Sequence, residues 1–317
     1  MKKNILFLLT SLMIFIALPN CVANDKVTLL LDWFINPDHG PIIIAEEKGY
    51  FDDLSIDVEI IAPADPSMPP KLVAAGKADI AISYQPQLHL QVTQGLPLKR
   101  IGTLVATPLN CLLVLENGPI RSPADLKNKK IGFSVAGVEE AILKAMLNRY
   151  DISMTDIDLI NVNFSLSPAL MSKQVDAVIG AFRNFELNQM DIENVPGKCF
   201  YVEEEGVPPY DELIYVANSN VMEKEKLIRF LRATELATQF IINNPNESWE
   251  IFSSTSNELQ NELNKRAWFD TIPRFALRPF AYDEARYRMF QDFLLESKLI
   301  DNKMDITDFV EDITRNE

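Results

Sequence analysis

The sequence predicts an α/β protein whose two lobes of similar plan face each other across a ligand cleft. Short apolar runs alternate with helical segments along most of the 317 residues, which is typical of parallel strands covered by helices on both faces. Residues 77–83 and 174–180 also align position for position, each around an aspartate that leads into a buried strand. This repeat predicts that one α/β plan occurs twice, and a chain of this length can bury a core in each copy.

The amino end has the composition of an export signal. Lys2 and Lys3 precede an apolar stretch over residues 5–18, which a proline and an asparagine then break. Small residues before Asn24 predict cleavage there, so that residues 1–23 form a signal peptide and the mature protein is periplasmic. Lipid attachment at Cys21 is the less favoured alternative, because proline and asparagine replace the small residues that usually precede a lipidated cysteine. No later stretch is long and apolar enough to span a membrane.

Composition disfavours several classes of function. The chain carries 45 acidic and 30 basic residues and no basic stripe, so we expect neither nucleic-acid binding nor docking on anionic lipid. The motifs of metalloproteases, serine hydrolases, phosphate-binding loops and dinucleotide folds are missing, and no residues have metal-ligand spacing. We therefore expect a monomeric, non-enzymatic binding protein without a cofactor or metal.

Histidines and cysteines are few. His39 falls in the first strand-end loop, whereas His89 is expected on a helix as a partly buried surface residue. Cys111 lies in an apolar run, far in sequence from Cys199. The sequence leaves open whether Cys111 is a small core residue or forms a disulfide with Cys199 in an oxidising compartment.

The first lobe is predicted to comprise residues 24–107 and 211–317. Apolar runs bounded by turn residues predict its strands, and helical periodicity ended by glycine or proline predicts its helices. We expect strands at residues 27–31, 55–61, 78–83, 98–106 and 212–217. We expect helices at residues 42–49, 71–75, 223–243, 247–265 and 283–295, and another that ends at residue 94.

The second lobe is predicted to comprise residues 108–210. The chain is expected to cross between the lobes at residues 107–110 and again at 206–211, where prolines cluster. Strands are expected at residues 111–115, 130–134, 158–162 and 176–181. Helices are expected at residues 122–126 and 135–150, and a third follows the capping segment 163–168.

Candidate ligand-binding residues lie where strands end and helices begin, because open α/β sheets bind ligands there. The first such loop holds Trp33, Asn36 and His39, together with Pro37 and Pro41, whose fixed dihedrals limit the entropy lost on binding. Trp33 offers a flat surface for stacking, and its neighbours offer polar contacts. We expect this loop to form one wall of a small-molecule site.

Further candidates follow other strands. The turn at Ser134 and Gly137 opens a helix, and bare amide groups there suit an acceptor on a ligand. Phe182 and Glu186 are four residues apart and share a face if a helix starts there. These aromatic rings, amides and one carboxylate suit a flat, polar heterocycle. The predicted ligand-binding set is Trp33, Asn36, His39, Tyr84, Gln85, Asn110, Ser134, Gly137, Phe182 and Glu186.

Three segments carry a resemblance to a known family. They are Leu-Asp-Trp-Phe at residues 31–34 with Asn36 and His39, Glu-Lys-Gly-Tyr-Phe at 47–51, and the glycine turn at 75–79. They resemble the periplasmic binding proteins for thiamine pyrimidine precursors, within the NMT1/THI5-like superfamily, and the resemblance runs over about residues 27–217. It implies a type II periplasmic binding protein fold that closes by a hinge. It also implies delivery of formylaminopyrimidine or hydroxymethylpyrimidine to an ABC permease driven by an ATPase.

The resemblance also bears on individual residues and leaves alternatives. Phe182 stands where relatives often have tyrosine, so a stacking face is kept and a hydroxyl is lost. Residues 37–41 also differ from the usual form of the loop. The same superfamily contains a pyrimidine synthase that consumes its own histidine, and His39 lies in the matching loop, but that enzyme's cysteine-rich motif is missing here. A binding protein for a sulfonate or riboflavin is the other alternative.

Overall fold

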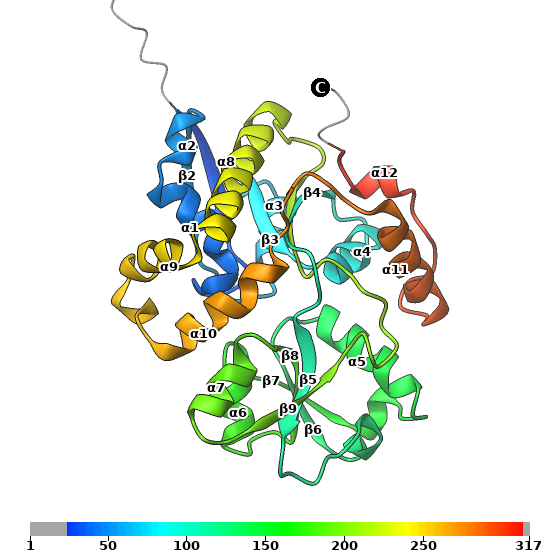
Figure 1. Cartoon of the computed structure of the whole chain (residues 1–317). Helices are drawn as coiled ribbons and strands as arrows, with labels where there is room; N and C mark the ends of the chain where they lie inside the picture. Colours follow the sequence, from blue (N-terminus) through cyan, green and yellow to red (C-terminus); the bar gives the residue numbers. More distant parts are fainter. Residues whose placement is uncertain (1–23, 313–317) are drawn as a thin grey trace, which may run out of the picture.

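The computed structural model describes residues 24–312, which form two five-stranded sheets (Figure 1). The predicted signal peptide and Cys21 lie outside the described residues. The strands of the first sheet are, in spatial order, β2 (Ile56–Ile61), β1 (Asp25–Leu30), β3 (Ile80–Ser83), β10 (Leu213–Asn218) and β4 (Leu98–Val105). Those of the second are β7 (Asp158–Asn161), β6 (Lys130–Phe133), β8 (Ala177–Phe182), β5 (Asn110–Leu115) and β9 (Gly197–Tyr201).

The two sheets share one plan, as the internal repeat predicted. In the first sheet β1 runs parallel to β2 and β3, and β10 runs antiparallel to β3 and β4. In the second sheet β6 runs parallel to β7 and β8, and β5 runs antiparallel to β8 and β9. The repeated aspartates also have matching roles. Asp79 accepts a hydrogen bond from the backbone N–H of Thr28 at 2.8 Å, and Asp176 accepts one from that of Lys130 at 2.9 Å.

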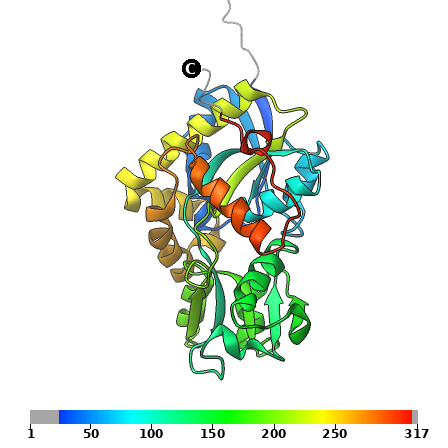
Figure 2. The ribbon, with the colours of Figure 1, turned by 90° about the vertical axis from the view of Figure 1, so that its right-hand side faces the viewer.

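Helices cover both faces of the first sheet, because successive strand residues point to opposite sides. Leu29 belongs to a core that includes residues of α1 (Gly40–Glu47), α2 (Tyr50–Asp53) and α8 (Lys224–Asn243). Leu30 belongs to a second core, with residues of α3 (Pro69–Ala74), α4 (Gln85–Thr93) and α12 (Ile306–Phe309). Figure 2 shows α11 (Glu284–Glu296) beside the red segment that carries α12.

The second sheet is covered in the same way. α5 (Val138–Asn148) packs against one face, where Ile142 shares a core with Ile131 of β6 and Ile179 of β8. α6 (Leu166–Met171) and α7 (Glu186–Ile192) pack on the other face, where Leu170 and Met190 meet residues of β5 and β8. Each lobe is therefore a three-layer α/β unit, as predicted.

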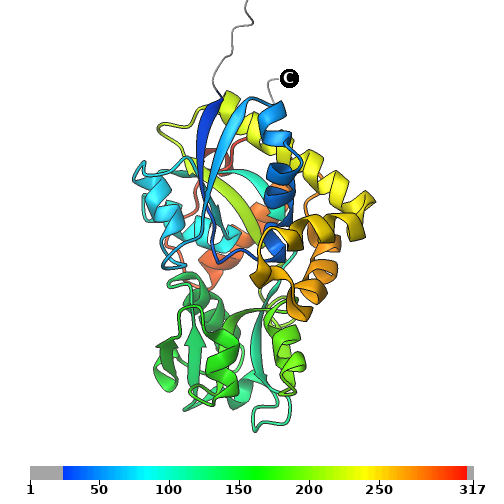
Figure 3. The same ribbon diagram turned by 90° about the vertical axis from the view of Figure 1, so that its left-hand side faces the viewer.

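The chain passes between the sheets twice, from β4 to β5 and from β9 to β10. The predicted limits of the lobes, at residues 107/108 and 210/211, fall within these two connections. Figure 3 shows the two lobes end to end, with the connections running between them. No helix in residues 24–312 combines the length and apolar character needed to cross a bilayer.

The single helix expected over residues 247–265 is wrong. The structure instead has α9 (Pro245–Ser254) and α10 (Glu262–Thr271), separated by a short 3₁₀ turn at Asn257–Leu259. The break has a local cause, because the side chains of Ser256 and Asn261 each cap the start of the element that follows. A helix with two internal capping residues is stopped and restarted.

The structure answers two further questions, about the two cysteines and about His89. Cys111 and Cys199 form a disulfide that joins β5 to β9, with 5.5 Å between their Cα atoms. The prediction that His89 is a partly buried surface residue is wrong, because its side chain is buried and its ring contacts Tyr287, Phe290 and Phe309. Burial lowers the pKa of His89 to about 3, so the ring is neutral and serves as core.

Candidate functional site

A pocket lies between the two lobes, bordered by loops at the ends of strands, where small-molecule sites of α/β folds are commonly found. Loops that follow β1, β3 and β8 contribute to it, together with the ends of β5 and β8, the starts of α5 and α6, and the second connection between the lobes. The side chains that line the pocket come from Asp32, Trp33, Asn36, Asp38, Tyr84, Pro86, Asn110, Val135, Val138, Glu139, Ile142, Leu166, Phe182, Phe185, Glu186, Tyr210 and Glu212, and Gly180 contributes backbone.

The loop after β1 is held in place by its own hydrogen bonds. Asn36 caps a 3₁₀ turn (Pro37–His39), with its Oδ1 accepting from the backbone N–H of Asp38 at 2.8 Å. His39 Nδ1 accepts from the backbone N–H of Asn36, so Nε2 carries the proton and donates to Asp32 Oδ1 at 3.0 Å. His39 is fully buried and does not line the pocket. It orients Asp32, which does.

Asp32 in turn fixes Tyr84, which ends the loop after β3. The Tyr84 hydroxyl donates to Asp32 Oδ2 at 2.8 Å, and both side chains are buried. Burial and the charge of Asp32 raise the pKa of Tyr84 well above its usual value, so the hydroxyl remains a donor. The Tyr84 ring meets Phe182 of the other lobe edge to face, with 6.5 Å between the ring centroids. The two lobes therefore meet through aromatic rings inside the pocket.

A second aromatic group lies around Trp33. Its ring meets Phe164 edge to face, with 4.6 Å between the ring centroids. Phe34 contacts both Phe164 and Phe185, at centroid distances of 6.3 and 5.9 Å. Trp33 and Phe185 line the pocket itself, whereas Phe34 and Phe164 line the adjoining outer groove. Two aromatic residues from each lobe thus separate the pocket from that groove.

Five buried carboxylates line the pocket: Asp32, Asp38, Glu139, Glu186 and Glu212. Within the described residues, no lysine, arginine or histidine lines it. Burial raises the pKa of Asp38 to about 6, of Glu186 and Glu212 to about 7, and of Glu139 to about 8. Such a pocket favours a ligand that donates hydrogen bonds or carries positive charge.

Glu186 begins α7 and faces the pocket from the second lobe. Its Oε2 accepts from the backbone N–H of Phe182 at 2.7 Å. The expected helical relation between these two residues is wrong, because Phe182 ends β8 and the helix starts only at Glu186. They nevertheless line the same pocket, since the turn between them folds the carboxylate back onto the strand end.

The expectation that backbone N–H groups at the start of α5 are free to bind a ligand is also wrong. The backbone N–H of Ser134 donates to Glu139 Oε2 at 2.7 Å, and that of Gly137 donates to Glu140 Oε2. The helix therefore caps itself with acidic side chains from its first turn, where its dipole stabilises negative charge. Ser134 and Gly137 do not line the pocket, whereas Glu139 does.

Glu212 lies at the end of the second connection between the lobes, and Asn110 begins β5, directly after the first. Glu212 Oε2 accepts from the backbone N–H groups of Leu109 and Asn110, at 2.5 and 2.9 Å. Asn110 Oδ1 accepts from the backbone N–H of Gly180 at 3.0 Å. These bonds link one connection to the other and to β8, so the hinge side of the pocket is rigidly held.

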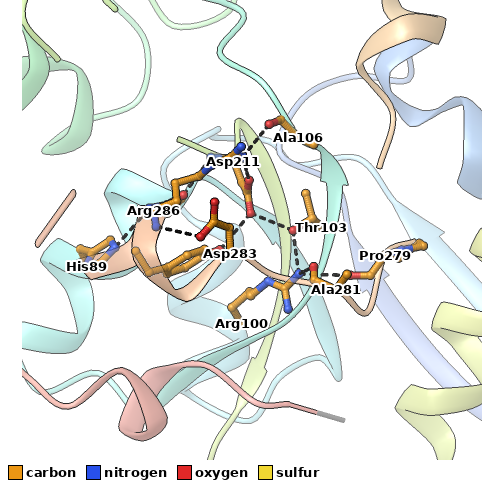
Figure 4. A network of polar contacts seen from close by, with 11 residues as sticks. His89, Arg100, Thr103, Ala106, Asp211, Pro279, Ala281, Asp283 and Arg286 are labelled. Carbon is orange, nitrogen blue, oxygen red and sulfur yellow. Dashed lines mark hydrogen bonds and ion pairs between the residues drawn. The ribbon is translucent and has the colours of Figure 1, made fainter. Parts of the chain in front are cut away.

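Gln85, another predicted site residue, supports the hinge and does not line the pocket. Its Oε1 accepts from the backbone N–H of Asp211 at 2.8 Å. The Asp211 carboxylate accepts from the hydroxyl of Thr103 at 2.9 Å and from Arg286 (Figure 4). The buried Arg100 extends this network, donating to Thr103 and to the backbone carbonyls that precede α11.

Of the ten predicted residues, six line the pocket: Trp33, Asn36, Tyr84, Asn110, Phe182 and Glu186. His39 and Gln85 act behind it, and Ser134 and Gly137 lie beside it. The prediction missed most of the carboxylates. Asp32 and Asp38 flank predicted residues in the first loop and could have been found there. Nothing in the sequence singles out Glu139 or Glu212, which read as an ordinary first-turn residue and a strand residue.

The lining residues do not form a metal site. No group of three or more His, Cys, Asp or Glu side chains within residues 24–312 is arranged to hold a metal ion. The carboxylates instead bond to backbone N–H groups and to polar side chains.

Comparisons with known proteins agree with this geometry. The family described as NMT1/THI5 like matches residues 36–248. The chain belongs to the NMT1/THI5-like family. A relative from Haemophilus influenzae whose name assigns it to thiamine biosynthesis is 49% identical over 92% of this chain and 93% of its own length. The formylaminopyrimidine-binding protein of Halalkalibacterium halodurans is 32% identical over 74% of this chain and 72% of its own.

The family also includes enzymes. The 4-amino-5-hydroxymethyl-2-methylpyrimidine phosphate synthase of Legionella pneumophila is 24% identical over 89% of this chain and 90% of its own length.

Among solved structures, the alkanesulfonate-binding protein of Xanthomonas axonopodis matches with a TM-score of 0.71 at 13% identity, over 92% of this chain and 99% of that one. A Candida albicans protein with the generic periplasmic binding protein fold also has a TM-score of 0.71, at 17% identity, over 92% of this chain and 97% of that one. This NMT1/THI5-like protein therefore has the periplasmic binding protein fold predicted from its sequence.

Proposed function

We propose that this protein is the solute-binding component of an ABC importer and captures a thiamine pyrimidine precursor, formylaminopyrimidine or hydroxymethylpyrimidine. The observation that carries the proposal is a buried pocket between two lobes that combines aromatic rings with carboxylates and, within residues 24–312, has no cationic side chain in its lining. An aminopyrimidine is flat, donates hydrogen bonds through its amino group and becomes cationic when its ring is protonated. Each of these properties has a matching group in the pocket.

Trp33 and Glu186 are proposed to make the main contacts. Trp33 presents its ring from the first lobe, and the pyrimidine would stack on it. Glu186 binds the backbone through Oε2, and its carboxylate would accept from the amino group and from a protonated ring nitrogen. Asn36, Tyr84, Asn110 and Phe182 complete the proposed contact set. His39, Gln85, Ser134 and Gly137 would act indirectly, through the residues that they position.

Several features support a periplasmic carrier. The Cys111–Cys199 disulfide is typical of an oxidising compartment. Solved structures with this fold include a ligand-binding component of an ABC-type import system from Staphylococcus aureus. The partners of the mature protein would be the small ligand and an ABC permease with its ATPase, and we expect it to act as a monomer.

The two alternatives fit the pocket less well. Five buried carboxylates would repel a sulfonate, and solved sulfonate binders resemble this chain at less than 20% identity. A synthase that consumes His39 would need that ring within reach of a substrate. His39 is fully buried, both of its ring nitrogens are bonded, and Asp32 stands between it and the pocket.

Isothermal titration calorimetry tests the proposal. We expect the mature protein to bind hydroxymethylpyrimidine or its formylamino precursor, and not taurine or riboflavin. Heat with taurine alone would reject the proposal. For the synthase, purified protein would be incubated with pyridoxal phosphate and iron, and its intact mass measured. An unchanged mass removes the enzyme, whereas loss of mass at His39 with release of a pyrimidine product would replace the binding function.

A further inference from the structure

Asn110 has one polar group without a partner at the wall of the pocket. The residue begins β5, is only 4% exposed and lines the pocket. Its backbone N–H donates to Glu212 Oε2 at 2.9 Å, and its backbone carbonyl accepts from Arg183 at 3.0 Å. Its Oδ1 accepts from the backbone N–H of Gly180 at 3.0 Å. Within residues 24–312, no hydrogen bond involves Nδ2. Because Nδ2 is also not enclosed by protein atoms, its two N–H groups are accessible from the pocket.

The orientation of this amide is fixed by an irregularity in β8. The pairing of β8 with β5 contains a bulge, and Gly180 lies in it with a φ of +91°. A Cβ at Gly180 would fall 2.1 Å from Glu139 Oε1, so any other residue would collide with that carboxyl group. A backbone N–H can only donate, so the atom that Asn110 turns toward Gly180 must be its oxygen. The amide therefore cannot flip, and its nitrogen remains a donor.

The other amide and hydroxyl groups among the lining side chains of residues 24–312 are already engaged. The Asn36 amide donates to a backbone carbonyl of its own loop at 3.1 Å, and the Tyr84 hydroxyl donates to a carboxylate at 2.8 Å. The Tyr210 hydroxyl interacts with Glu212. A donor that is buried without an acceptor costs stability. The free amide of Asn110 thus favours a ligand that supplies an acceptor at this position.

Asn110 lies next to the residues proposed to hold the pyrimidine ring. It is the sheet partner of Phe182, the last residue of β8. The backbone N–H of Phe182 donates to Glu186 Oε2 at 2.7 Å, and all three residues line the pocket. Asn110 and Glu186 therefore flank the same strand end. A ring held by Glu186 would have its side arm available for contact with Asn110.

We propose that Asn110 determines the specificity of the pocket by donating, through Nδ2, to a carbonyl oxygen on the side arm of the pyrimidine. The inference rests on the proposed function and narrows it, since of the two proposed ligands only the formylamino compound carries a carbonyl group. A carbonyl oxygen accepts hydrogen bonds and cannot donate, so it matches an N–H donor. A hydroxyl can also donate, so it could bond instead to one of the lining carboxylates. The ligand class is therefore an N-acylaminomethyl pyrimidine.

Calorimetry with three derivatives of 4-amino-2-methylpyrimidine tests this role. The probes carry a formylaminomethyl, a hydroxymethyl or a methyl group at position 5, and the methyl compound keeps the ring without a polar arm. We expect the formylamino compound to bind at least about tenfold more tightly than either of the others, because a site built around a donor disfavours analogues that leave it unpaired.

Asn110→Asp should change this preference, because it keeps an acceptor for the backbone N–H of Gly180 and replaces the free donor by a second acceptor. We expect binding of the formylamino compound to weaken at least about tenfold. Binding of the hydroxymethyl compound should change less than about threefold, since its hydroxyl can donate to the new carboxylate. Asn161→Asp is the matched control, because Asn161 is exposed and its Oδ1 also accepts from a backbone N–H, at 2.8 Å. It should alter none of the three affinities.

Asn110→Ala adds no charge and decides the question if melting curves show that Asn110→Asp does not fold. It should weaken the formylamino compound about tenfold and leave the methyl compound within about threefold. Binding of the formylamino compound no tighter than that of the methyl or hydroxymethyl compound would overturn the role of Asn110 alone. An equal loss for all three probes in the folded Asn110 variants would do the same. If none of the probes binds the folded wild type, both this inference and the proposed function fail.

Discussion

Trp33 and Glu186 belong to different lobes, yet both line one pocket. Trp33 follows a buried strand of the first sheet, and Glu186 starts a helix after a strand of the second. Because the two sheets repeat one plan, their strand-end loops are directed at the same space. A ligand ring held by both residues would therefore link the lobes, and each residue should contribute separately to affinity.

Substitution of either residue should weaken pyrimidine binding. We expect Trp33→Ala and Glu186→Gln each to cost about 1–3 kcal/mol, through lost stacking and through a weakened charge-assisted hydrogen bond. Glu193→Gln makes the same charge change at an exposed position just after α7 and should leave the affinity unaltered. Calorimetry measures all three variants. Equal affinity in wild type and Glu186→Gln would exclude this carboxylate from the site.

His39 should matter for stability more than for contact with the ligand. His39→Ala leaves Asp32 without its buried donor and the backbone N–H of Asn36 without its acceptor. We expect a loss of about 1–3 kcal/mol in the free energy of unfolding, measured by urea denaturation. His39→Gln offers a donor and an acceptor on a similar side chain and should recover part of this loss. Unchanged stability in His39→Ala would contradict the positioning role.

At the scale of elements, the two equivalent aspartates show how one sequence pattern yields two outcomes. Asp79 and Asp176 each accept from a backbone N–H of the neighbouring strand. Asp79 is also paired with Lys226 of α8 at 2.9 Å, whereas Asp176 is exposed. The repeat therefore reflects a common structural role, and the surroundings set how much each copy contributes.

We expect Asp79→Ala to destabilise the protein more than Asp176→Ala does. The first change removes a partly buried hydrogen bond and an ion pair, for about 1–2 kcal/mol, and the second removes one exposed hydrogen bond at smaller cost. Urea denaturation of both variants measures the difference. A larger loss for Asp176→Ala would contradict this assignment.

Periodicity made the elements predictable, and it also limited what could be seen of the site. Strands such as β3 are short apolar runs between turns, so the loops that follow them could be located and Tyr84 proposed. Glu139 and Glu212 could not, because each looks like a normal residue of its own element. They enter the pocket because α5 packs against Gly180 of β8 and because the second connection bonds to Leu109 and Asn110. Similarly, the break between α9 and α10 depends on capping residues that a purely apolar pattern does not register.

At the scale of the whole molecule, direct contacts join the lobes across the pocket. Asn184 of the second lobe donates to Asp38 Oδ1 and to Thr271 Oγ1 of the first, both at 2.7 Å. All three side chains are buried. The backbone N–H of Ala136 also donates to the hydroxyl of Ser67 across the cleft, at 3.1 Å. We infer that these contacts stabilise a closed form of the two lobes, because they exist only when the lobes are close together.

Asn184→Ala should therefore favour the open form without unfolding either lobe. We expect pyrimidine to dissociate about tenfold faster, since two buried hydrogen bonds between the lobes are lost. Asn188→Ala, which removes a more exposed contact with Asp270, should change the rate less than about twofold. Stopped-flow fluorescence measures both rates. Equal dissociation rates in the two variants would contradict the closing role of Asn184.

The buried carboxylates should also make the stability of the ligand-free protein depend on pH. The pKa values of Asp38, Glu186, Glu212 and Glu139 are raised to between about 6 and 8, so the folded form keeps protons that the unfolded chain releases. Stability from this source is complete below about pH 4 and is lost as the pH rises to about 8. We expect the melting temperature to fall between about pH 5.5 and 8.5.

Glu139→Gln should reduce that slope, since Glu139 has the highest of these pKa values and faces Glu140 and Glu186. The exposed change Glu204→Gln serves as the control of equal charge. Differential scanning calorimetry across this range measures the effect. A melting temperature that rises steadily toward about pH 8.5 in the wild type would contradict the burial of unneutralised carboxylates.

The most direct test is a crystal structure of the mature protein with hydroxymethylpyrimidine or its formylamino precursor bound. We expect the ring to lie between the lobes with one face against Trp33 and its amino group within hydrogen-bonding distance of the Glu186 carboxylate. A ligand bound outside this pocket, or a pocket in which Trp33 and Glu186 do not contact the same molecule, would contradict the proposed mode of binding.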